Sequence, residues 1–120
     1  MKLLVSALLS LVSAKSAQYK PTEAKINVLT WGNEISYKIT NGNGATVCSG
    51  GPFAWHDEHA LDCNLEEGSY NLECIDSYGD GWHGGYITID NKEFCRDFRS
   101  GHKTSRTFRT TTLQAQTLPN

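Results

Sequence analysis

The ten residues from Asp76 to Gly85, DSYGDGWHGG, combine two carboxylates with four glycines. Asp76 and Asp80 offer hard oxygen ligands, and the glycines let backbone carbonyls approach an ion closely. An EF-hand is excluded, because its third ligand position would be Tyr78 and its twelfth Ile87. Two interpretations stay open: a calcium ion bound by Asp76 and Asp80, or two aspartates that hydrogen-bond backbone amides and fix the loop.

Several aromatic residues fall in or beside predicted loops. Such rings can stack on sugars, while polar neighbours bind the hydroxyl groups. We predict a ligand-contact surface made by Trp55, Tyr78, Trp82 and Tyr86. The alternative is that the rings cap the core, which suits Trp31 and Trp82 best, whereas Trp55 has the strongest claim to exposure.

Two other groups of residues could do chemistry. His56 and His59 would share a face on a helix and, with His83 or His102, could bind zinc or copper. The neighbouring Gly51-Pro52 predicts a loop instead, in which the histidines are solvated. Acids are plentiful over residues 57–90, but no spacing singles out an acid and a nucleophile. We therefore predict no catalytic residue, with a small glycan-active hydrolase as a remote alternative.

The first seventeen residues have the pattern of a secretory signal peptide. A basic start precedes an apolar run over residues 3–12 and then small residues, with cleavage after Ala14 favoured over Ala17. The run is too short to anchor the chain in a bilayer. We expect a secreted, extracellular protein with a signal peptide over 1–17, an N-terminal arm over 18–24, one domain over 25–112 and a disordered tail over 113–120.

Secretion determines how the four cysteines are interpreted. An even number in an oxidising compartment predicts two disulfides, for which three pairings are possible. We favour Cys48–Cys63 and Cys74–Cys95, because each pair joins neighbouring segments. A zinc site of four cysteines is disfavoured, since the chain has no C-x-x-C pair.

Short alternating segments predict an all-β domain. Apolar residues alternate with polar ones over residues 26–28, 35–39, 61–65, 70–74 and 86–89, and Asn41-Gly42-Asn43-Gly44 predicts a hairpin turn. Further strands are expected at 45–49, 94–98 and 103–112. About eight strands with this spacing, and no helical periodicity, indicate an antiparallel β-sandwich of jelly-roll type. The predicted core comprises Ile26, Val28, Ile35, Tyr37, Ile39, Leu61, Leu65, Tyr70, Leu72, Ile87, Ile89 and Phe108.

Charge is spread unevenly along the domain. Residues 57–90 hold nine acids and no lysine or arginine, and residues 92–109 hold six bases and two acids. Pairing between strands explains part of this pattern, and the rest could form a cation site and a basic surface for anionic glycans. The net charge of −2 gives no reason to expect nucleic acid, and no apolar run is long enough for a transmembrane segment.

Two stretches carry a family resemblance. The segment from Cys63 to Tyr70, CNLEEGSY, followed by DSYGDGW, resembles a repeated β-domain of secreted and cell-surface proteins from marine bacteria and microbial eukaryotes. WGNEISY over 31–37 and GGPF over 50–53 extend the similarity, which covers about residues 25–109. The resemblance implies a jelly-roll-like sandwich with an extracellular binding or matrix role and no known catalytic residues.

These observations together favour a small secreted module that binds rather than catalyses. We expect lectin-like or adhesion-type recognition of extracellular glycan, cell wall or protein, assisted by calcium. The alternative is a structural matrix or effector-type protein that acts through a protein partner.

Overall fold

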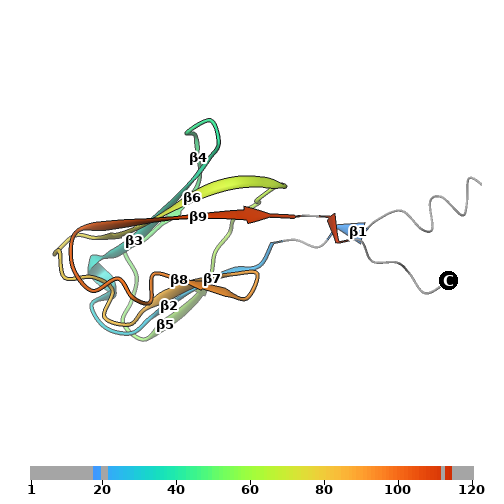
Figure 1. The fold of residues 1–120 in the computed structure, drawn as a ribbon. Coiled ribbons are helices and arrows are strands. Elements are labelled where there is room, and N and C mark those ends of the chain that lie inside the picture. The colour runs from blue at the N-terminus through green and yellow to red at the C-terminus, as the bar shows by residue number, and fades with distance from the viewer. Residues whose placement is uncertain (1–17, 20–21, 112, 115–120) are drawn as a thin grey trace, which may run out of the picture.

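The computed structural model describes residues 18–19, 22–111 and 113–114. The predicted signal peptide lies outside the described residues, as do residues 20–21 of the predicted arm and residues 115–120 of the predicted tail. The two short strands β1 (Gln18–Tyr19) and β10 (Leu113–Gln114) pair antiparallel, so the chain enters and leaves the domain at one place (Figure 1).

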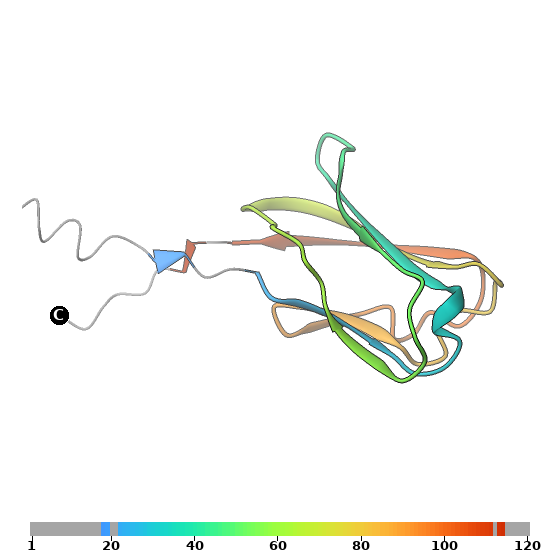
Figure 2. The same ribbon diagram turned by 180° about the vertical axis from the view of Figure 1, so that it is seen from behind.

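The domain consists of two four-stranded antiparallel sheets packed face to face (Figures 1 and 2). One sheet has the order β5-β2-β7-β8 and the other β4-β3-β6-β9. The strands are β2 (Ala24–Val28), β3 (Ile35–Asn41), β4 (Thr46–Gly50), β5 (Asp57–Ala60), β6 (Gly68–Asp76), β7 (Tyr86–Ile89), β8 (Lys92–Phe94) and β9 (Lys103–Thr110), and a single 3₁₀ turn, η1 (Gly32–Glu34), precedes β3. The predicted antiparallel β-sandwich of about eight strands is confirmed.

The core follows from the alternation of side chains along each strand. In β6, alternate residues from Tyr70 to Asp76 are buried, and β2 and β3 show the same period of two. Ten of the twelve predicted core residues are buried, while Leu61 and Phe108 are partly buried and pack against the others. The core also contains Trp82 and Phe98.

The predicted hairpin turn is present between β3 and β4. The Asn41 side-chain oxygen accepts hydrogen bonds from the Asn43 and Ala45 N–H groups, at 2.9 and 3.0 Å. Gly44 supplies the positive φ, 83°, that closes the turn. This local chemistry fixes the register of the β3–β4 pair.

Both favoured disulfides are confirmed, Cys48–Cys63 and Cys74–Cys95. Cys74 lies in β6 of one sheet, and Cys95 follows β8 of the other, so this bridge ties the two sheets together through the core. Cys74 and Cys95 are both buried, whereas Cys63 is only partly buried.

Two predicted strands are misplaced. The strand expected at 61–65 lies instead at 57–60, as β5. The prediction failed because β5 is an edge strand whose mostly exposed residues need no apolar alternation. The strand near Phe94 ends there instead of reaching Phe98, because Cys95 has a positive φ of 71° and turns the chain. No helix in the described part of the chain is long and apolar enough to cross a membrane.

We predict that the two disulfides contribute unequally to stability. Replacing Cys74 and Cys95 together by alanine should lower the free energy of unfolding by about 3 kcal/mol through loop entropy, with a further loss from the core. The matched variant, with Cys48 and Cys63 both replaced by alanine, should lose a similar stabilisation from loop entropy. It should lose less from core packing, because Cys63 is only partly buried. Urea unfolding of both variants measures the difference, and equal losses would contradict it.

Candidate functional site

Three loops converge at the end of the sandwich that is opposite β1 and β10. The first loop leads through η1 into β3, the second precedes β5, and the third follows β6. Hydrogen bonds join them: the Ser77 N–H donates to the Glu34 carbonyl at 2.9 Å, and the His56 N–H donates to the Leu29 carbonyl at 2.7 Å. The register that places Ile35 opposite Asp76 brings Glu34 beside the third loop. We call this region the loop end.

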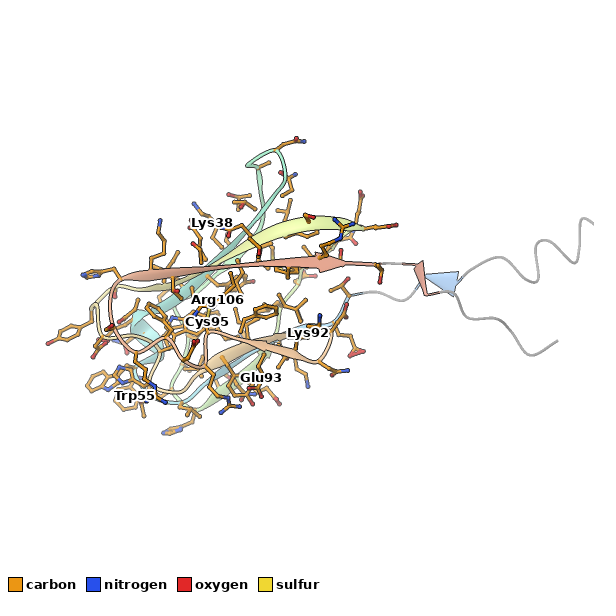
Figure 3. All side chains as sticks on the ribbon, viewed as in Figure 1. Lys38, Trp55, Lys92, Glu93, Cys95 and Arg106 are labelled. Carbon is orange, nitrogen blue, oxygen red and sulfur yellow. A yellow bond between two sulfur atoms is a disulfide. The ribbon has the colours of Figure 1, made fainter. Side chains whose placement is uncertain are left out.

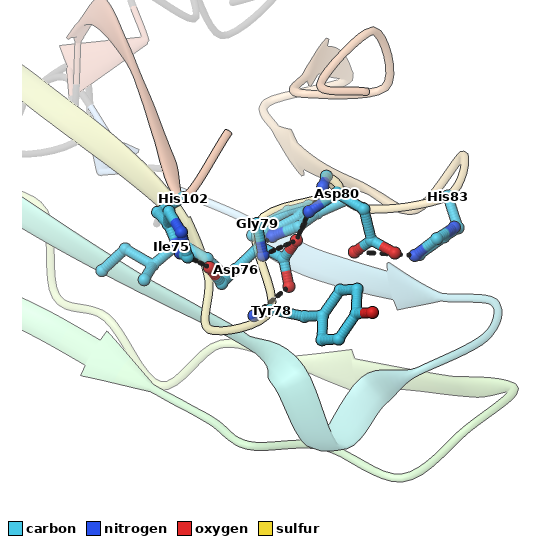
Figure 4. Close-up of polar contacts among 9 residues, drawn as sticks. Ile75, Asp76, Tyr78, Gly79, Asp80, His83 and His102 are labelled. Atoms are coloured by element: carbon cyan, nitrogen blue, oxygen red, sulfur yellow. Dashed lines mark hydrogen bonds and ion pairs between the residues drawn. The ribbon is translucent and has the colours of Figure 1, made fainter. Parts of the chain in front are cut away.

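The Asp76 carboxylate organises the third loop (Figure 4). Its Oδ1 accepts a hydrogen bond from the Tyr78 N–H at 3.2 Å, and its Oδ2 accepts from the N–H groups of Gly79, Asp80 and Gly81. Burial acts to raise the pKa of the Asp76 carboxyl, but hydrogen bonding to Asp80 and to these N–H groups outweighs it and holds the pKa below its usual value. Asp76 is therefore an ionised loop scaffold.

The glycines of the loop make this arrangement possible. Gly79 and Gly81 have φ values of 99° and 84°, which side chains rarely adopt. A Cβ on Gly81 would collide with the Phe98 carbonyl oxygen and would lie 2.6 Å from Arg99 Cα. The motif is therefore explained by backbone geometry around one carboxylate.

Trp82 packs in the core beneath the third loop and hydrogen-bonds the end of β6 before it. Its ring is fully buried, and its Nε1 donates a hydrogen bond to the Ile75 carbonyl at 3.0 Å. Trp82 therefore cannot contact a ligand at the surface, and the prediction that it does is wrong. The alternative prediction, that Trp82 caps the core, is the correct one.

Three carboxylates meet beside this scaffold. One oxygen from each of Glu34, Asp76 and Asp80 lies within 4.8 Å of the others. Glu34 Oε2 and Asp80 Oδ1 are buried and make no hydrogen bond. Burial raises the pKa of the Glu34 carboxyl, and the negative charges of Asp80 and Asp76 raise it further, while His83 opposes the shift. The cluster thus carries repulsion that a cation would relieve.

His83 gives only partial compensation for this charge. Its Nε2 lies 3.3 Å from Asp80 Oδ1, a contact drawn as a dashed line in Figure 4, and neither atom has a hydrogen-bond partner. One carboxylate oxygen from each of Glu34, Asp76 and Asp80 forms the donor set for an ion. Carboxylate oxygens are hard ligands of the kind that calcium prefers.

The predicted histidine site is not assembled. His56 does not lie on a helix, and His59 in β5 contacts Asp57 at 3.8 Å and the edge of the Phe53 ring. Within the described ranges, Glu34, Asp76 and Asp80 are the only group of three with metal-ligand geometry. His102 belongs to the scaffold, with its Nδ1 3.2 Å from the Asp76 carbonyl oxygen.

Exposed aromatic rings lie at the same end of the domain as the carboxylates. Trp31 and Trp55 form a pair with ring centroids 4.7 Å apart, and Tyr78 is 72% exposed. Trp55 Nε1 is held by Asn33 Oδ1 at 2.9 Å, and Figure 3 shows Trp55 at the loop end. The prediction that Trp31 caps the core is wrong, because its side chain is 45% exposed.

Tyr86 does not belong to this surface. The Arg96 guanidinium lies 3.9 Å above its ring centroid, and its hydroxyl accepts a hydrogen bond from the Asn27 amide at 3.0 Å. One ring face is thereby covered, and the residue lies in β7 rather than in a loop. Of the four predicted contact residues, Trp55 and Tyr78 remain available at the loop end.

Sequence reasoning missed Glu34 and Trp31 as members of the site. The available signal was that Glu34 precedes β3 and Asp76 ends β6, two strands whose antiparallel pairing brings these positions to one end. No protein-family model, curated protein sequence or solved structure matches the chain.

We predict that Asp76 contributes much more to stability than Asp80 does. Asp76→Ala leaves four backbone N–H groups without their acceptor and should cost about 3–5 kcal/mol. Asp80→Ala removes repulsion and should leave stability within about 1 kcal/mol of wild type. Thermal and urea unfolding without divalent ions measure both effects, and comparable losses would contradict this assignment.

The Asp76 contribution should also depend on pH. Its folded pKa lies below the unfolded value, so its stabilisation is complete above the unfolded pKa and is lost as the pH falls through the folded pKa. Asp76→Asn should therefore flatten the acid side of the stability profile, which a series of urea titrations at decreasing pH would reveal.

Proposed function

We propose that this chain is a secreted, non-catalytic binding module that recognises extracellular glycan through its loop end with the help of calcium. The observation that carries the proposal is the exposed Trp31–Trp55 pair at the end of the domain that also holds the Glu34, Asp76 and Asp80 carboxylates, where the Glu34 N–H donates to the Trp31 carbonyl at 2.9 Å. Exposed aromatic rings together with polar oxygens are the combination that sugar binding uses.

The backbone at Trp31 supports a functional role for this ring. Trp31 has left-handed φ and ψ angles of 58° and 36°, a conformation that costs a non-glycine residue roughly 1–2 kcal/mol. Folding alone would favour glycine at this position. A tryptophan held there with its side chain exposed is typical of strain that is retained for binding.

Calcium fits the carboxylate cluster on electrostatic grounds. A divalent cation would satisfy the buried oxygens of Glu34 and Asp80 and would offset both the burial and the repulsion by Asp80 and Asp76 that raise the Glu34 pKa. The ion would also stiffen the contact between η1 and the third loop, which already share the Ser77–Glu34 hydrogen bond. Trp31 directly precedes η1 and would then be held in position for the ligand.

Secretion is supported by two independent features. Residues 1–17 have the composition of a signal peptide, and all four cysteines are paired in disulfides, which persist in oxidising compartments. Cell wall or matrix polysaccharide is then the natural class of ligand for the loop end.

Two alternatives use the same surface. Leu29, 40% exposed, extends the apolar patch of Trp31 and Trp55 and would suit a protein partner in a structural or effector role. The closeness of Glu34 and Asp80, with a raised Glu34 pKa, is the feature that a glycan-active hydrolase would need for its acid. Turnover of a bound glycan that Glu34→Gln abolishes would favour the hydrolase.

We predict calcium binding that depends on Asp80. Calcium at about 100 times its Kd should stabilise the folded chain by about 2.7 kcal/mol, and Asp80→Asn should remove both the calorimetric heat and the rise in Tm. Affinity should weaken as the pH falls through the raised Glu34 pKa, because the proton competes with the ion. Asp97→Asn, at a side chain 78% exposed near Arg106, is the matched control. Calcium binding that persists in Asp80→Asn would refute the site.

We predict that the tryptophans serve binding more than folding. Trp31→Gly relieves the left-handed backbone and loses the contact with Trp55, so stability should change by less than about 1 kcal/mol. Retention on the polysaccharides or cell walls that wild type binds should fall about tenfold or more in Trp31→Gly and Trp55→Ala. Val47→Ala, at another exposed apolar residue, should bind normally.

The retention assay also separates the two main functions. If wild type is retained on no polysaccharide, with or without calcium, the glycan proposal fails. Concentration-dependent self-association in sedimentation, lost in Trp55→Ala, would then support the protein-partner alternative.

A further inference from the structure

The strand with the longest free edge in the sandwich is β9. The strands at the edges of the two sheets are β4, β5, β8 and β9, with five, four, three and eight residues. β6 pairs with one side of β9, and no described strand pairs with the other side. An unpaired strand edge presents a row of N–H and C=O groups that can pair with another extended chain.

A hydrogen bond at the end of the β6–β9 ladder shows which backbone groups of β9 face this edge. The Asp76 N–H donates to the His102 carbonyl at 2.8 Å, and these two residues continue the register of the ladder. Because backbone groups alternate in direction along a strand, the even-numbered residues of β9 bond to β6. The N–H and C=O groups of Thr107 and Arg109 therefore point to the free edge.

Arg106 protects one part of this edge and leaves the other part open. Its Nη1 donates to the Ser105 carbonyl at 2.9 Å, and its Nη2 pairs with Asp97 at 3.1 Å. Charged side chains of this kind protect edge strands against pairing with other chains. Among the described residues, no side chain makes a similar hydrogen bond to the backbone of Thr107 or Arg109.

A groove of about 440 Å³ lies along the open part of the edge, between β9 and the β7–β8 hairpin. Thr107 and Arg109 line it, and because their side chains lie on the outer face of the sheet, they present backbone to the groove. The rings of Phe94 and Phe108, with centroids 5.8 Å apart, are partly buried and form an apolar wall. Unpaired backbone and an apolar wall thus adjoin at one place.

The charges around the edge differ between its two faces. On the outer face, Arg109 Nη1 donates to Ser69 Oγ at 2.9 Å, and Arg109 has no carboxylate within 4.0 Å among the described residues. In the groove, Lys92 lies with Glu23 and Asp90, so the lining carries charges of both signs. A residue paired opposite Arg109 should therefore be acidic, and a residue that enters the groove should be uncharged.

A second copy of this chain fits the edge poorly. Antiparallel pairing of two β9 strands over the open residues would bring the two Arg109 side chains close together. Like charges across a strand pair are destabilising. The edge is therefore better suited to a different chain that carries acidic residues.

We propose that the open edge of β9 binds an extended segment of a partner protein by strand addition, and that acidic and apolar residues alternate in this segment. The added strand runs antiparallel to β9, with its acidic side chains on the outer face beside Arg109. Its apolar side chain enters the groove against Phe94 and Phe108. Figure 3 shows Lys92, which lines the groove, at the opposite end of the sandwich from Trp55, so this site is separate from the loop end.

The test is calorimetric titration of the purified, disulfide-bonded chain with an acetylated and amidated peptide of three Glu-Val repeats. Wild type should bind it, and a peptide with serine in place of valine should bind at least tenfold more weakly, because its side chains do not fill the apolar part of the groove. Lysine in place of glutamate should weaken binding about threefold or more, and Arg109→Ala should remove this difference. The matched control, Arg99→Ala, removes an exposed arginine beside Asp80 and His83 and should preserve the difference.

Backbone pairing is tested separately. In an antiparallel addition, the glutamate N–H groups of the peptide face β9 and the valine N–H groups face away from it. N-methylation of the glutamates should lower affinity at least tenfold, whereas N-methylation of the valines should lower it much less. Thr107→Pro removes one outward N–H but no hydrogen bond to β6, so it should fold with a Tm near that of wild type and bind at least tenfold more weakly.

Three results would overturn the proposal: no binding of the Glu-Val peptide, equal effects of the two methylations, or peptide binding that Trp55→Ala or a calcium chelator abolishes. Sedimentation of wild type tests the other occupant. Self-association that Thr107→Pro abolishes would assign the edge to a second copy and would also overturn the proposal.

Discussion

The loop end depends on one carboxylate that four backbone N–H groups share. Asp76 is buried at the end of β6, where an ionised group needs compensation, and the N–H groups of residues 78–81 provide it. This requirement determines the glycine conformations at Gly79 and Gly81, and the same turn leads directly to buried Trp82. Exposed Tyr78 and partly exposed Asp80 are what remain for function once the scaffold is satisfied.

Because of this constraint, the two aspartates have different roles. They occur in one motif and are chemically identical, yet Asp76 is saturated with donors while Asp80 has an oxygen without a partner. Loop scaffold and ion ligand, which the sequence left as alternatives, can therefore both apply, each to a different residue. Glu34 supplies the second unsatisfied oxygen from η1, the turn that leads into β3.

Local sequence signals predicted most of the fold. Alternation identified the buried strands, Asn-Gly identified the hairpin, and the proximity of cysteines in sequence identified the disulfides, because each signal reflects interactions between near neighbours. The edge strand β5 was not predicted, because an exposed edge strand shows no apolar alternation. The early end of β8 was not predicted either, because nothing in the sequence indicates that Cys95 has a left-handed backbone conformation.

The candidate site was less predictable because it is assembled across strands. Asp76, Asp80, Trp55 and Tyr78 were identified by residue type. To predict that Glu34 belongs to the site, one would need the register of β3 on β6. To predict that Trp31 is exposed, one would need to know its left-handed backbone angles, which tryptophan seldom adopts. Tyr86 looked available in the sequence, but Arg96 from a later turn covers it.

The Cys74–Cys95 bridge has a mechanical consequence. The chain enters and leaves the domain beside β1 and β10, so a pulling force between the two ends would travel along the backbone to Cys74 and then pass through the sulfur atoms to Cys95. Residues 75–94 lie outside that load path. The Asp76 turn and its carboxylate partner Asp80 are therefore shielded from tension, and this part of the loop end would keep its shape while the surrounding strands were being stretched.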